Sequence, residues 1–156
     1  MNGAQIHLWL NHTPIFGVLI GLLILLFAVY KKSEELKRAG LGLFLATALI
    51  AIPTYLTGEP AEEVVETLPG VEASFIEAHE EWALAALIAV EVLGLAALAG
   101  LLFSRKPGRY STMAIRGCVI LAILAFGIVA WTAHLGGQIR HPETRAGFPA
   151  EVGEED

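Results

Sequence analysis

Four long runs of apolar residues divide this chain, and the short segments between them hold nearly all of its charge. Each run is close to the roughly 20 residues that a helix needs to cross a bilayer. A helix satisfies its own backbone hydrogen bonds, which lipid cannot do. The chain is 55% hydrophobic, whereas soluble domains average about 45–50%. We therefore predict an all-α integral membrane protein with spans at 6–30, 39–56, 82–103 and 112–135.

The basic residues predict how these spans are oriented. Eight of the ten Lys and Arg residues lie in segments 31–40 and 104–116, and segment 57–81 has none but contains eight glutamates. The positive-inside rule places the two basic segments in the cytoplasm. Both termini are then periplasmic, for a protein of the bacterial inner membrane. Short connections favour an up-down four-helix bundle, with one domain over 1–145 and an acidic tail over 146–156.

The connection between the second and third spans is long enough to form structure of its own. Residues 61–68 (AEEVVETL) predict a short amphipathic helix that lies on the membrane surface or covers the mouth of the bundle as a lid. A further helix starts near Ala73 and runs into the third span, and the fourth helix is expected to break at Gly136–Gly137. Small residues allow helices to approach closely in lipid, and six glycines suit that role: Gly17, Gly21, Gly94, Gly100, Gly117 and Gly127.

All five histidines fall on the predicted outer side: His7, His12, His79, His134 and His141. Neutral imidazole is a common ligand of haem and of metal ions. Haem b needs two histidines from facing helices. The candidates are His12, His79 and His134, and the sequence leaves open which two would be axial.

A transition metal ion such as copper, zinc or iron would need three or four ligands. It would use the same three histidines together with His141 and Glu80. A third alternative is a structural or assembly subunit without a cofactor, in which the histidines are merely solvated or cap helix ends.

Glu91 lies near the middle of the third span, where a charge is costly. It is either a neutral side chain bonded to a neighbouring helix or part of a proton path. The net charge of −6 argues against a nucleic-acid partner, and the single Cys118 excludes CxxC chemistry. Because the chain has no nucleophile–base pair, P-loop or dinucleotide motif, an electron-transfer subunit is favoured over an autonomous enzyme.

Three segments carry a resemblance to a known family: residues 11–17 (NHTPIFG), 77–81 (EAHEE) and 134–143 (HLGGQIRHPE). With four spans, the chain resembles the DUF2231 family of small bacterial membrane proteins over about residues 5–145. Related domains occur joined to Rieske-type or c-type cytochrome units, so the resemblance implies a haem-b electron-transfer subunit. It marks four histidines, with Arg140 as a partner of a haem propionate: His12, His79, His134 and His141.

The leading hypothesis is therefore a membrane redox subunit that binds haem b near the periplasmic face. It would pass electrons between the quinone pool and a separate partner, such as a cytochrome or a Rieske-type protein. A homo-oligomer and a subunit of a larger complex are both compatible with the sequence.

Overall fold

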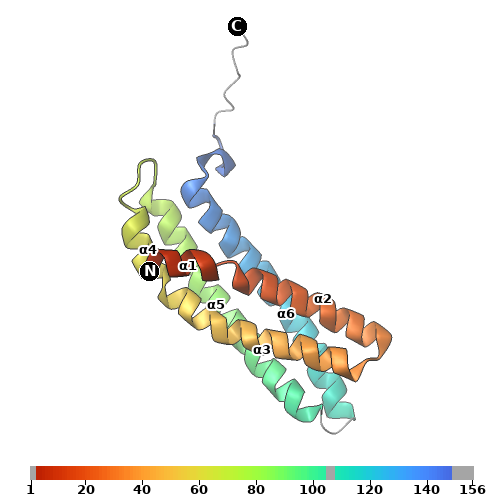
Figure 1. Cartoon of the computed structure of the whole chain (residues 1–156). Coiled ribbons are helices and arrows are strands. Elements are labelled where there is room, and N and C mark those ends of the chain that lie inside the picture. The colour runs from red at the N-terminus through yellow and green to blue at the C-terminus, as the bar shows by residue number, and fades with distance from the viewer. Residues whose placement is uncertain (1–2, 105–107, 149–156) are drawn as a thin grey trace.

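The computed structural model describes residues 3–104 and 108–148, and every regular element in that part of the chain is helical (Figure 1). In chain order the elements are α1 (Gly3–Leu10), α2 (Thr13–Lys31), α3 (Glu34–Leu56), α4 (Gly58–Val65), α5 (Ala73–Phe103), α6 (Arg109–Arg140) and the 3₁₀ turn η1 (Pro142–Thr144).

Four stretches are long and apolar enough to cross a membrane: Gly3–Lys31, Glu34–Leu56, Ala73–Phe103 and Ser111–Arg140. At most 39% of the most apolar part of any stretch is buried inside the chain. The rest is large apolar side chains on the surface, an arrangement that lipid tolerates and water does not. The prediction of an all-helical fold with four stretches long and apolar enough to cross a membrane is confirmed for the described residues.

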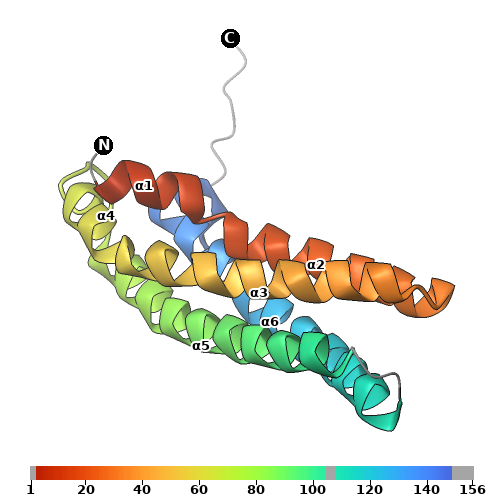
Figure 2. The ribbon, with the colours of Figure 1, turned by 60° about the horizontal axis from the view of Figure 1, so that its bottom comes forward.

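The four long helices pack in a ring, with α2 against α3, α3 against α5, α5 against α6, and α6 back against α2 (Figures 1 and 2). The turn between α2 and α3 is tight. Lys32 ends α2 in the left-handed conformation, and the Ser33 side chain accepts a hydrogen bond from the Leu36 N–H at 3.3 Å. The largest fully buried side chains in the middle of the ring include Phe44, Leu25, Leu41, Leu93 and Val18.

Four of the six glycines identified in the sequence lie where helices touch. A Cβ on Gly17 would meet Thr47, one on Gly21 would meet Phe44, and Gly94 and Gly100 face α3 in the same way. Gly17 and Gly21 form a GxxxG pair that packs against α3 of the same chain. The expectation for Gly117 and Gly127 was wrong, because a Cβ at either position would meet nothing within 4 Å.

Three boundaries differ from those that the sequence predicted. The first span is two helices, α1 and α2, because Pro14 has no N–H to continue the hydrogen-bond ladder from Leu10. The short helix α4 covers Gly58–Val65 instead of 61–68. Finally, α6 continues through Gly136–Gly137 to Arg140 without a break, since a glycine costs a helix only about 1 kcal/mol and neighbouring turns support it.

Candidate functional site

One end of the bundle gathers the residues of interest, and we call it the histidine end. It consists of α1, α4, the last turn of α3, the first turns of α5 and the last turns of α6 (Figure 1).

His7 on α1 is held against the end of α3. Its Nδ1 atom lies 3.0 Å from the main-chain oxygen of Thr54 and 3.3 Å from the Thr57 hydroxyl. A carbonyl oxygen can only accept, so Nδ1 carries the proton and Nε2 keeps its lone pair. Thr54 lies in the last turn of α3, where carbonyl groups lack a full set of helical partners and are free to accept from a side chain.

His79 on α5 is held against α6 in the same way. Its Nδ1 atom lies 3.0 Å from the main-chain oxygen of Thr132, so it too is the protonated nitrogen. The Thr132 hydroxyl is 3.1 Å from the main-chain oxygen of Trp82 on α5. The same hydroxyl also lies 3.0 Å from the main-chain oxygen of Ile128 in its own helix, so its one proton is shared between the two acceptors. Both contacts with α5 help to fix the register of α5 on α6.

The two imidazoles are close enough to interact electrostatically. Both are half-buried, and within the described part of the chain neither Nε2 has a hydrogen-bond partner. A glycine lies next to the Cε1 carbon of each ring. A Cβ on Gly58 would be 4.0 Å from Cε1 of His7, and one on Gly136 would be 2.9 Å from Cε1 of His79. The fold therefore orients both imidazoles at the same end of the bundle, and each ring lies against the backbone of a neighbouring glycine.

The other predicted histidines lie apart from this pair. His12 is exposed in the turn between α1 and α2, where its Nδ1 contacts the Asn11 side chain. His134 is exposed on α6, with its ring against Trp131 and its Nε2 3.3 Å from the Gln138 amide. Of the three histidines predicted as haem ligands, only His79 belongs to the pair formed by His7 and His79.

The carboxyl-terminal candidates are on the surface. The His141 ring lies 2.9 Å from the Glu143 carboxylate on the surface, and Arg140 is exposed at the end of α6. A hydrogen bond from the backbone, and then the contact with His141, lower the pKa of Glu143. Among residues 3–104 and 108–148 no group of three or more His, Cys, Asp or Glu side chains is placed to hold a metal ion.

A carboxyl pair joins α4 to α5 at the histidine end. The neighbouring carboxyl group of Glu80 on α5 raises the pKa of Glu62 on α4. Glu80, which the metal hypothesis used as a ligand, is therefore engaged with α4.

The roles of two residues, His7 and Arg145, were not predicted from the sequence. His7 lies outside the three motifs, although it belongs to the helix that precedes the Pro14 break. Arg145 stands at the edge of the acidic tail, yet its guanidinium bonds Glu72 at 2.7 Å and lies 4.1 Å from the centre of the Phe75 ring. It also donates to the main-chain oxygen of Gln138 at 2.9 Å. No motif in the sequence predicts that Arg145 anchors the segment after α6 to the start of α5.

Glu91 lies within α5, between the histidine end and the opposite end of the bundle. Its Oε1 atom is buried without a hydrogen-bond partner in the described part of the chain. This atom therefore makes no bond to a neighbouring helix in the described part of the chain, and the proton path stays a prediction.

No protein-family model matches this sequence, and neither a curated protein nor a solved structure similar to it was found. The resemblance to the DUF2231 family therefore stays a prediction from the three motifs.

Proposed function

We propose that this protein is an electron-transfer subunit of the bacterial inner membrane that holds haem b between His7 and His79. The basic residues of the α2–α3 and α5–α6 connections favour the cytoplasm, so the histidine end, at the opposite end of the bundle, would face the periplasm. The helix α4 then lies on the periplasmic side, next to the site.

The observation that carries the proposal is the hydrogen-bonding pattern that the two imidazoles share. Each donates Nδ1–H to a main-chain carbonyl of another helix, at 3.0 Å in both cases. Such a bond fixes the tautomer and the ring plane of a histidine ligand and makes Nε2 more basic. Two ligands of this kind, from α1 and α5, would hold a b-type haem.

Glycines lie next to both rings, and the main-chain oxygens of Thr54 and Thr132 hold the two imidazoles by hydrogen bonds. When bound, haem b supplies a centre that takes up and releases one electron. Within this chain, the threonine carbonyls orient the ligands, and α4 with its Glu62–Glu80 contact covers them.

A non-haem metal site is less well supported. It requires a third or fourth ligand near the same ion, and the described residues contain no such group. A subunit without any cofactor is the remaining alternative. In that case the two histidines would serve only to fasten α1 to α3 and α5 to α6.

The test is an optical spectrum of the protein purified from haem-replete cells, oxidised and reduced, with metal content measured on the same sample. We expect a Soret band and a b-type α-band that are lost in His7→Ala and in His79→Ala. The matched controls are His12→Ala and His141→Ala, at exposed positions, and they should keep the spectrum.

A wild-type protein without a Soret band would overturn the haem proposal. So would a spectrum that survives His7→Ala and is lost in His12→Ala, because it would assign the ligand to another side chain. Because a variant may lose haem by misfolding, helix content and elution from a sizing column are compared for all four.

A further inference from the structure

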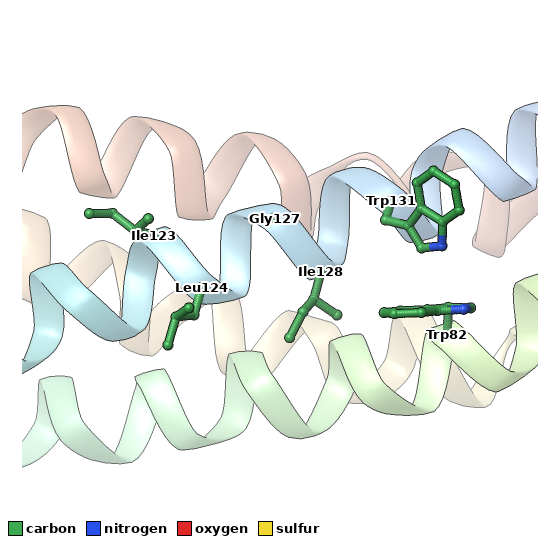
Figure 3. Close-up of a pocket in the computed structure, with 6 residues that line it drawn as sticks. All are labelled: Trp82, Ile123, Leu124, Gly127, Ile128 and Trp131. Atoms are coloured by element: carbon green, nitrogen blue, oxygen red, sulfur yellow. The ribbon is translucent and has the colours of Figure 1, made fainter.

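A second site lies on the outer surface of α5 and α6, away from the two oriented histidines. It is an apolar groove of about 510 Å³, within the usual range of small-molecule sites. Its lining comes from one residue of α5 and five of α6: Trp82, Ile123, Leu124, Gly127, Ile128 and Trp131 (Figure 3). It lies within two of the membrane-crossing stretches and is open to the side that faces lipid.

Two tryptophans close the groove toward the histidine end. The rings of Trp82 and Trp131 are 6.3 Å apart and cross at 75°, an edge-to-face pair. Outside the lining, the His134 ring lies 5.4 Å from that of Trp131. The other end of the groove, at Ile123 and Leu124, is purely aliphatic. Indole N–H groups at one end and aliphatic side chains at the other fit a molecule with a polar head and an apolar tail.

The tryptophan end of the groove offers hydrogen-bond donors. Neither indole N–H has an acceptor within the described part of the chain. Figure 3 shows both indole nitrogens on the side of the pair toward the carboxyl end of α6. A carbonyl oxygen is the complement of such a donor.

The charge of the lining distinguishes between lipid classes. No Lys or Arg side chain lines the groove, and phosphate groups are usually bound by cations. A phospholipid head group is therefore poorly matched, whereas an uncharged head that carries carbonyl groups fits.

We propose that this groove binds an isoprenoid quinone, with its head beside Trp82 and Trp131 and its tail along Ile123 and Leu124. The choice of a quinone among carbonyl-bearing lipids rests on the proposed electron-transfer function. The floor of the groove is Gly127, where a Cβ would meet nothing within 4 Å. Larger side chains at this position fill the groove without pushing on the backbone of a neighbouring helix.

The test uses Gly127→Leu, with Gly117→Leu as its matched control. Gly117 lies on the same helix, and a Cβ there also meets nothing within 4 Å, but it does not line the groove. All proteins carry Trp9→Phe, so that only Trp82 and Trp131 fluoresce. They are placed in phosphatidylcholine nanodiscs and titrated with ubiquinone-2, whose head quenches tryptophan emission.

We expect saturable quenching that is weakened roughly tenfold or more in Gly127→Leu, about 1.4 kcal/mol in binding, and unchanged in Gly117→Leu. Quenching that rises without saturation, or that is equal in both variants, would overturn the proposal. So would the selective loss of a co-purifying phospholipid, instead of quinone, from Gly127→Leu. If this variant does not fold, Ile123→Phe obstructs the other end of the groove and carries the same expectation.

The absorption spectrum of the same samples separates this proposal from the haem proposal. Saturable quinone binding without a Soret band removes the haem function and leaves the groove. A Soret band without saturable binding removes the groove and leaves the haem function.

Discussion

The Nδ1 atom of His79 on α5 lies 3.0 Å from the main-chain oxygen of Thr132 on α6, and the Thr132 hydroxyl lies 3.1 Å from the main-chain oxygen of Trp82 back on α5. Thr132 thus accepts a hydrogen bond from α5, and its hydroxyl proton is shared between the main-chain oxygens of Trp82 on α5 and of Ile128 in its own helix. This reciprocal contact orients a histidine and joins two helices, and its two roles can be separated by mutation.

Thr132→Val removes the hydroxyl and keeps both the shape and the main-chain oxygen that holds His79. We expect a loss of about 0.6–1.5 kcal/mol in stability, the range for one hydrogen bond between helices in a membrane. Thermal unfolding in detergent measures it. Thr112→Val is the control, since its exposed hydroxyl bonds only Gly108 of its own helix, and it should change the midpoint little.

Gly136→Ala tests the orientation of His79 directly. The added Cβ would lie 2.9 Å from Cε1 of His79, so the ring must move away from α6. We expect weaker retention of haem, or a shifted α-band, with little change in helix content. The adjacent Gly137→Ala introduces the same group where nothing lies within 4 Å. Equal spectra for the two variants would contradict a site that depends on the position of this ring.

Arg145→Ala should release the segment after α6 from the start of α5. The side chain is only 10% exposed, and its guanidinium combines an ion pair with Glu72, main-chain acceptors and the Phe75 ring. We expect a loss of about 2 kcal/mol in local stability, or a roughly 30-fold larger open population. Limited proteolysis of residues 141–148 measures this opening. Arg140→Ala removes an exposed cation nearby and should leave the cleavage rate unchanged.

The contact between α4 and α5 should weaken as pH rises. The neighbouring carboxyl group of Glu80 raises the folded-state pKa of Glu62 above its value in the free chain. Folding therefore favours the protonated form, and the stabilisation is complete below the ordinary glutamate pKa. It is lost as pH rises through the raised pKa. Hydrogen exchange of the α4 amides should accelerate over that window, and Glu62→Gln should abolish the dependence, whereas Glu63→Gln on the same helix should retain it.

The proposed orientation predicts which loops a membrane-impermeant thiol reagent reaches from the periplasm. In a Cys118→Ser background, Glu63→Cys on α4 should be labelled in spheroplasts and Glu35→Cys at the start of α3 should not. Both positions are exposed in the fold, so a difference between them reports the side of the membrane. The opposite pattern would place the histidine end in the cytoplasm.

The number and the approximate positions of the stretches long and apolar enough to cross a membrane were predictable from the sequence alone. A helix that crosses lipid must be apolar over about 20 consecutive residues, so it can be recognised from local sequence. The helix start near Ala73 was predictable on the same local grounds. The turn at Pro14 also has a local cause, the missing N–H, although the sequence reading treated α1 and α2 as one span.

The pairing of His7 with His79, by contrast, was decided only by the tertiary structure. On one continuous helix, His7 and His12 would point roughly 140° apart, and nothing local says which faces the bundle. The break before α2 turns His7 toward α3 and leaves His12 in solvent. The same holds for Gly136 against Gly137 and for Arg145 against Arg140. In each pair the residue type is equal, and only contacts between distant segments distinguish the residue that packs from the one that does not.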